Sequence, residues 1–217
     1  MRNDERLRTI YEVMAPYIVR NEHNWRDYLA FASQFHKHSF DNILLVYAQD
    51  EDVSILATRK QWAAIGRNLI PRAKGVAVCV YRNAKLTLDY LFDVSQTTGK
   101  EIHPTDWQLS DEMKEALTER LSYAHGFPKQ GFSQALYALA SESVADNYNH
   151  FLQELKQETK GHLFTEIPAG GFEAQYIQLL TDSISYFIGK KCHLPDEEIQ
   201  LSDGMATVSH FNTLPLV

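Results

Sequence analysis

Apolar residues recur at helical spacing along the first part of the chain, which predicts three successive helices. Asn and Ser side chains favour helix N-caps, and Pro disrupts a helix interior. The predicted helices cover residues 5–20, 24–35 and 40–49, with Asn24 and Ser39 as candidate N-caps and Pro16 as a kink or break. The acidic run at residues 50–52 ends this pattern.

The next segment has a pattern typical of strands. We expect a short strand at residues 53–57, then a helix that Thr58 caps and Gly66 closes. Two clearer strands cover residues 75–81 and 86–94, joined by a short hairpin-like connection. Alternating apolar residues of the second strand share one face. They are Leu86, Leu88, Tyr90, Phe92 and Val94.

The rest of the chain is helical in character. Apolar stripes predict helices over residues 110–126, 136–155 and 172–187, and the tail at 211–217 looks cut off rather than finished. We therefore predict an α+β fold that is helix-rich. We expect a front half, residues 1–105, that holds a small antiparallel sheet, and a helical rear half, residues 106–217, that is a candidate for a truncated region.

The composition is that of an ordinary globular protein. The 217 residues are 44% hydrophobic and 23% charged, with a net charge of −7. No apolar run is long enough for a membrane span, and the charged N-terminus lacks a signal-peptide pattern. Cys79 and Cys192 have no metal-ligand spacing, so we expect reduced thiols and a cytoplasmic protein.

Charge changes this picture over one window. Residues 53–88 contain seven Lys or Arg and no acid, whereas the whole chain has 21 basic and 28 acidic residues. Lys and Arg bind phosphates regardless of base identity, and exposed aromatic rings stack on unpaired bases. The window therefore favours single-stranded nucleic acid, although a solvated loop that merely lacks acids remains an alternative. The candidate DNA-binding residues are Arg59, Lys60, Trp62, Gly66, Arg67, Arg72, Lys74, Gly75, Tyr81, Arg82 and Lys85.

These candidates have different expected roles. The cations would track phosphates, and the glycine-bounded loop 66–75 would let the backbone approach a sugar–phosphate chain. Trp62 and Tyr81 are the candidates for stacking, with core packing as the alternative for Trp62.

Motifs for chemistry are missing. His36 and His38 do not share a helix face, and no further ligand follows at metal-binding spacing. The sequence has no His-Glu-x-x-His, no Gly-x-Ser-x-Gly and no P-loop. We therefore expect no metal, no cofactor and no enzyme, because a site would have to form from scattered residues such as Asp93, His103 and His125.

A set of residues spaced along the front half forms a motif series, which we call the recognisable series. They are the run from Phe35 to Gln49 with Ser39, Asn42, Leu44 and Leu45, then Ala57, Thr58, Trp62, Gly66, Arg67, Lys74 and Gly75, and finally the run from Leu91 to Thr97. This series resembles the N-terminal domain of ArdC-type antirestriction proteins. It is even more similar to the front segment of very large helicase- and methylase-like proteins of conjugative elements, and the rear half is similar to the next segment of those large proteins.

The resemblance implies single-stranded DNA binding in a mobile genetic element or phage, in conjugation or antirestriction. By position it supports Trp62, Gly66, Arg67, Lys74 and Gly75, whereas the other candidates rest on charge and aromatic character. The metallopeptidase-like domain of ArdC-type proteins and the helicase and methylase motifs are absent from this sequence. The alternative function is a protein-interaction module, whose acidic helical half docks further domains of a larger protein or a host defence protein.

Overall fold

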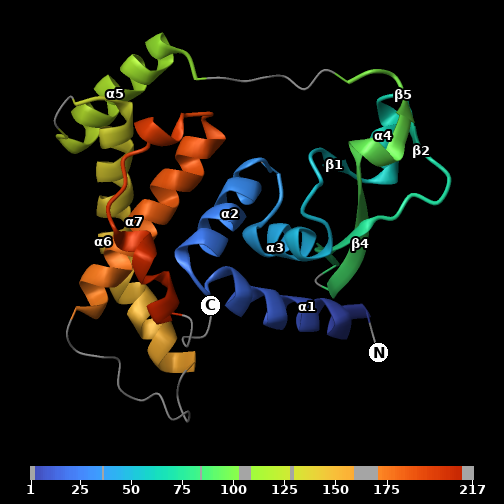
Figure 1. Ribbon diagram of the computed structural model, residues 1–217, viewed down its shortest axis with the longest axis horizontal. Helices are drawn as coiled ribbons and strands as arrows, with labels where there is room; N and C mark the ends of the chain where they lie inside the picture. The colour runs from blue at the N-terminus through green and yellow to red at the C-terminus, as the bar shows by residue number, and fades with distance from the viewer. Residues whose placement is uncertain are drawn as a thin grey trace. The chain divides into compact units, whose positions relative to one another are not determined.

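The computed structural model describes residues 3–35, 37–83, 85–102, 109–127, 130–158 and 171–211. The fold is α+β, as predicted, and the chain divides into two compact units (Figure 1). The sheet unit consists of residues 1–17 and 34–106, and the helical unit consists of residues 18–33 and 107–217. The units are thus interleaved in sequence, because residues 18–33 of the front half group with the rear half.

The sheet unit contains a three-stranded antiparallel sheet, in the order β1-β4-β3, and a two-stranded ribbon of β2 and β5. Its elements are α1 (Asn3–Ile18), α3 (Phe40–Gln49), β1 (Leu56–Ala57), α4 (Arg59–Ala64), β2 (Arg67–Leu69), β3 (Val76–Arg82), β4 (Lys85–Asp93), η1 (Val94–Gln96) and β5 (Thr97–Gly99).

Helix boundaries in this unit follow the cap residues. The Ser39 side chain accepts a hydrogen bond from the Asn42 backbone N–H at the start of α3. Thr58 and Gln61 form a capping box at α4, and Gly66 follows that helix with φ of +80°, a conformation that favours glycine. The predicted caps of α3 and α4 and the predicted end of α4 are therefore confirmed. By contrast, Pro16 lies inside α1, which continues to Ile18.

Two side-chain amides of α3 occupy the free edge of β3. The Gln49 amide accepts from Ala77 N–H at 2.9 Å and donates to Ala77 C=O at 2.9 Å. The Asn42 amide accepts from Cys79 N–H at 2.7 Å and donates to Cys79 C=O at 2.8 Å. An unpaired edge is a template for adding another strand. Here α3 satisfies that part of the edge, so the sheet ends at β3.

Buried polar contacts join the strands to the segments before and after them. Trp62 is 1% exposed, and its indole N–H donates to the Phe92 carbonyl at 2.8 Å. The Asp93 carboxylate accepts from the backbone N–H groups of Ser54, Ile55 and Ser95 at 2.8, 3.0 and 2.9 Å. Burial acts to raise the pKa of Asp93, but these hydrogen bonds outweigh it and leave that pKa below its ordinary value.

This carboxylate makes the stability of the sheet unit depend on pH. A lowered pKa in the folded state contributes stability above the unfolded pKa of about 3.9, which is lost as pH falls through the folded value. We expect the urea midpoint of the sheet unit to fall between about pH 5 and pH 3, and Asp93→Asn to flatten this dependence. The exposed Asp52, changed to Asn, is the control. If the urea midpoint depended on pH equally in the wild type and in Asp93→Asn, the pH dependence could not be assigned to Asp93.

The helical unit is built around α7. Its elements are α2 (Glu22–Ser33), α5 (Asp111–His125), α6 (Phe132–Glu158), α7 (Phe172–Lys191), η2 (Asp196–Glu198) and η3 (Gly204–Phe211). Helix α7 packs against α2, α6 and η3. Ser110 caps α5 and Gly126 ends it, as predicted. The expected cap of α2 is wrong: Asn21 holds that role, because its side chain accepts from Asn24 N–H at 2.9 Å.

One fully buried carboxylate organises the end of this unit. Asp182 of α7 has no exposed surface, and its oxygens accept from the backbone N–H groups of Ser202, Gly204 and Met205 at 2.9, 2.8 and 3.3 Å. The Ser202 hydroxyl also donates to it. Because these donors lie just before and at the start of η3, Asp182 fixes where this 3-10 helix begins.

Candidate nucleic-acid interface

The seven cations of the basic window do not have equivalent surroundings. Arg67 is used within the fold: its guanidinium donates to Thr97 Oγ1 at 2.7 Å, to Thr97 C=O at 2.9 Å and to Lys100 C=O at 2.6 Å. These bonds tie β2 to β5 and the residue that follows it. Arg82 forms an ion pair with Asp89 at 2.6 Å. Arg67 therefore serves the ribbon, and the charge of Arg82 is partly compensated.

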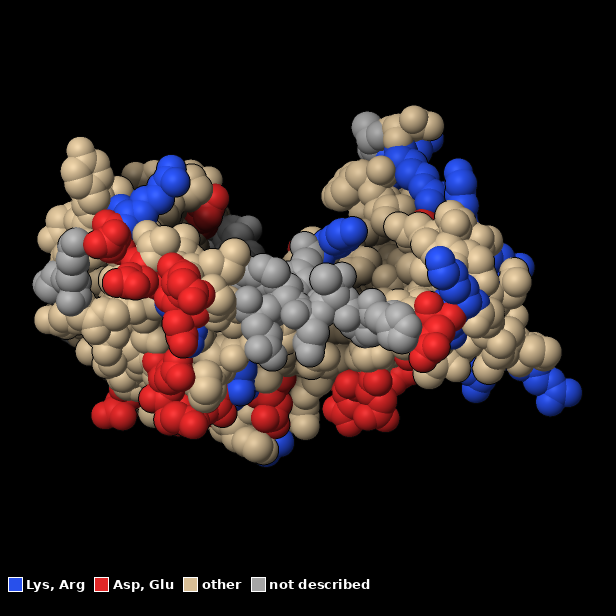
Figure 2. Space-filling view, turned by 90° about the horizontal axis from the view of Figure 1, so that it is seen from above, with Lys and Arg blue, Asp and Glu red and all other residues tan. Residues whose placement is uncertain are grey.

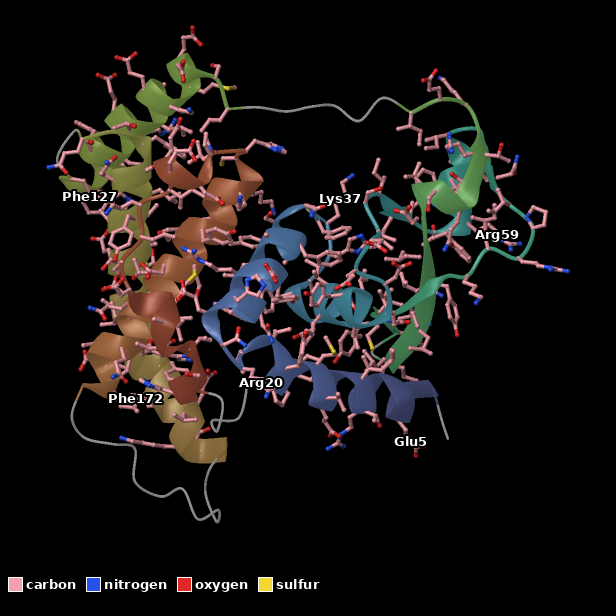
Figure 3. The ribbon with its side chains drawn as sticks, in the orientation of Figure 1. Glu5, Arg20, Lys37, Arg59, Phe127 and Phe172 are labelled. Carbon is pink, nitrogen blue, oxygen red and sulfur yellow. The ribbon has the colours of Figure 1, made fainter. Side chains whose placement is uncertain are left out.

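The other five cations of the window are all exposed, and two of them, Arg72 and Lys74, lie on the loop before β3. They are Arg59, Lys60, Arg72, Lys74 and Lys85, and Lys100 just outside the window is exposed as well. Among the described residues none of these side chains has a carboxylate partner. Arg59 extends from the first turn of α4 (Figure 3). On the face seen in Figure 2, Lys and Arg side chains are spread over the sheet unit together with some Asp and Glu, whereas Asp and Glu side chains, with fewer Lys and Arg, form a band over the helical unit.

The two glycines that bound loop 66–75 have structural explanations. Gly66 supplies the positive φ that ends α4. At Gly75 a Cβ atom would lie 3.0 Å from the Phe92 ring and 3.0 Å from Tyr90 Cβ, so glycine lets the chain pass closely over β4. Their expected role in a close approach to phosphates is not needed to explain them.

The two aromatic candidates, Trp62 and Tyr81, differ in how much of the ring is exposed. Trp62 is 1% exposed, so its ring faces cannot receive a base, and its expected stacking role is corrected to core packing. Tyr81 is 79% exposed, so a base could reach its ring. The structure adds Tyr90, which is 47% exposed and which the sequence reasoning did not select. The alternation of Leu86, Leu88 and Tyr90 along the strand could have indicated that Tyr90 shares a face with Tyr81.

The β3–β4 hairpin has one open face. In its antiparallel register Tyr81 lies opposite Leu86, Cys79 opposite Leu88, and Ala77 opposite Tyr90. Residues directly opposite one another project from the same face of a sheet. The other face carries Val76, Val78 and Leu91, which are all buried. The hydrophobic core of this unit thus lies on one side of the hairpin, and the tyrosines lie on the other.

The residues of the recognisable series and the residues supported by charge differ in their surroundings. Most members of the series have structural roles: Asn42 and Gln49 at the strand edge, Thr58 as a cap, Trp62 in the core, Gly66 and Gly75 in the backbone, Arg67 and Thr97 in the ribbon, and Asp93 as a buried acceptor. Lys74 belongs to the series but is exposed and makes no contact of this kind with other described residues that would explain it. The surface that could meet a ligand is therefore formed mainly by residues that charge and exposure identify.

The scattered residues considered for chemistry have structural partners where the structure describes them. The described residues contain no group of three or more His, Cys, Asp and Glu side chains placed to hold a metal ion. Asp93 is occupied by backbone donors, and His125 lies on α5 of the helical unit, with its Nδ1 2.8 Å from a Glu142 oxygen. His36 and His103 lie outside the described residues.

Comparison with protein-family models, curated proteins and solved structures finds no match for this chain. Within the part of the chain that the structure describes, no helix combines the length and the apolar character needed to cross a membrane.

Proposed function

We propose that the sheet unit binds single-stranded DNA without strong sequence preference, in the setting of DNA transfer or antirestriction that the sequence resemblance implies. The observation that carries this proposal is the set of five cations, Arg59, Lys60, Arg72, Lys74 and Lys85, which lack carboxylate partners among the described residues. Such cations release counterions from a phosphate backbone, which is the main source of sequence-independent affinity.

The first test is the salt dependence of binding. We expect fluorescence anisotropy with a labelled single strand to show log affinity falling linearly with log salt. About 3–6 phosphate contacts, each contributing about 0.7 to the slope, would give a slope of about −2 to −4. Reversing Arg59, Arg72 and Lys74 to Glu should abolish most binding at moderate salt and flatten the slope.

The control reverses two exposed cations of the helical unit, Arg120 and Lys156, to Glu. Arg67 is left unchanged because its hydrogen bonds hold β2 to β5, and its loss would confuse binding with folding. No binding by the wild type at low salt would refute the proposal. Equal losses in the two sets of variants would refute the assignment to the sheet unit.

One observation favours the alternative, a protein-interaction module. On α5 the polar residues Thr118 and Ser122 are buried, whereas Met113, Leu117 and Tyr123 are 48%, 39% and 94% exposed. A helix that turns apolar side chains outward is typical of surfaces that meet a partner. Binding through α5 would be insensitive to the charge reversals in the sheet unit and weakly dependent on salt, which separates the two functions.

A further inference from the structure

We propose that the open face of the β3–β4 hairpin is a stacking platform, on which Tyr81 and Tyr90 receive unpaired bases of the bound strand. This inference rests on the proposed function, and it adds the recognition element that distinguishes single strands from duplexes. The face consists of Ala77, Cys79 and Tyr81 on β3 and of Leu86, Leu88 and Tyr90 on β4.

The spacing of the two rings suits an extended strand. Tyr81 lies opposite Leu86, and Leu86 is four residues from Tyr90 along β4. At about 3.4 Å per residue, the two tyrosines are separated by roughly 14 Å along the hairpin. Leu86 and Leu88 lie between them on the same face, so an apolar surface connects the two rings. Bases bound by each ring would therefore lie along one continuous surface.

This face is more exposed to solvent than is usual for a surface made of large hydrophobic side chains. Tyr81, Leu86 and Tyr90 are 79%, 51% and 47% exposed, although they are large hydrophobic residues. Exposed apolar residues that are contiguous commonly mark a binding site. Because the amides of Asn42 and Gln49 occupy the β3 edge, a partner at β3 would meet the flat face of the hairpin rather than extend the sheet.

The charged residues around this face indicate which kind of ligand it would bind. Arg72 and Lys74 lie just before β3, at the end of the hairpin where Gly75 passes beside Tyr90. Lys85 lies at the opposite end, next to Leu86, but its pairing with Arg82 places it on the other face of the hairpin. The carboxylates of β3 and β4 are Asp89 and Asp93, which alternation places on the other face with Leu91. An acid close enough to act on the open face is Asp41 of α3, whose charge, after burial, helps to raise the pKa of Cys79. An apolar aromatic face with Arg72 and Lys74 at one end complements a strand of bases and phosphates, because bases stack on exposed rings while the cations contact the phosphates.

The first test uses the two native cysteines of the full chain. Cys79 lies on the proposed platform, whereas Cys192 lies in the helical unit and serves as the internal control. Burial raises the pKa of both thiols, so labelling with a small alkylating reagent is run at mildly alkaline pH. We expect an excess of a single-stranded oligonucleotide to slow labelling of Cys79 several-fold and to leave Cys192 unchanged.

The second test separates stacking from charge. Stacking contributes about 5- to 150-fold in affinity per base. We expect Tyr81→Ala with Tyr90→Ala to weaken single-strand binding by at least about tenfold at every salt concentration, without changing the salt slope. Tyr81→Phe with Tyr90→Phe keeps both rings and should bind like the wild type. Binding to a duplex of the same sequence should be unaffected by either pair.

Each outcome bears on a particular claim. Single-strand binding with unchanged labelling of Cys79, or with full affinity in the Ala pair, would overturn the platform and leave the proposed function intact. Protection of Cys79 that rises with protein concentration in the absence of DNA would show a second copy on this face and would also overturn it. Absence of any single-strand binding would overturn both proposals. Because the labelling uses the wild type, the result does not depend on whether the variants fold.

Discussion

Replacing Trp62 with Ala is expected to destabilise the sheet unit by about 3–5 kcal/mol, the range for removing a large aromatic side chain from a core. The indole is 1% exposed, and its N–H donates to the Phe92 carbonyl at 2.8 Å. The substitution would leave both a cavity and a carbonyl without its donor, and the second adds to the first. Since domains are stable by only about 5–15 kcal/mol, much of this unit's stability would be lost.

The measurement is urea unfolding followed by circular dichroism, in which a shift confined to one transition would identify the unit affected. Trp62→Phe keeps a ring but no donor, so we expect a smaller loss of about 1–2 kcal/mol. Tyr123→Ala removes an aromatic ring that is 94% exposed and should change stability by less than about 0.5 kcal/mol. If Trp62→Ala behaved like Tyr123→Ala, the core role assigned to the indole would be wrong.

Replacing Asp182 with Ala should have a comparable effect on the helical unit. The substitution removes the acceptor of three backbone N–H groups, those of Ser202, Gly204 and Met205, at a site with no exposed surface. Bonds to a charged acceptor contribute about 1.5–3 kcal/mol each, and buried donors without partners cost about 1–3 kcal/mol. We expect a combined loss of about 3–5 kcal/mol, with the start of η3 released.

An isosteric variant sharpens this test. In Asp182→Asn one oxygen becomes an NH2 group, and either orientation of the amide places it against an N–H donor, because Ser202 N–H meets one oxygen and Gly204 N–H the other. A loss of about 2 kcal/mol is therefore expected even without a change in volume. Asp203→Asn, at the exposed neighbouring position, is the control. Hydrogen exchange at residues 202–205 reports the loss locally, and unchanged protection would contradict the proposed role.

The sequence predicted those elements in which a cap and a hydrophobic period agree. Ser39, Thr58 and Ser110 each begin a helix that the structure contains, because capping acts between neighbours in the chain. The ribbon of β2 and β5 was missed. Each of its strands has three residues, too few to show a period, and its register pairs Leu69 with Thr97 across a long sequence separation. Such pairing depends on tertiary contacts that no local pattern records.

The candidate site was predictable in charge but not in geometry. Counting cations identified the window, yet it could not reveal that Arg67 is bound to the carbonyls of Thr97 and Lys100. The alternation of Leu86, Leu88 and Tyr90 predicted a shared face correctly. Which face of a hairpin is buried depends on the elements packed against it, and here the side with Val76 and Val78 became the core. That choice turned Tyr90 outward.

The interleaving of the two units has a consequence for how this architecture can be inherited. The sheet unit is made of residues 1–17 and 34–106, and the intervening residues 18–33 belong to the helical unit. A single recombination crossover near residue 105 would therefore separate α2 from α7 and leave Tyr28, Leu29 and Ala32, which are now buried, without their unit. Unlike modules joined end to end, these two units can pass between genes intact only as a pair, or through an exchange with two further breakpoints around α2.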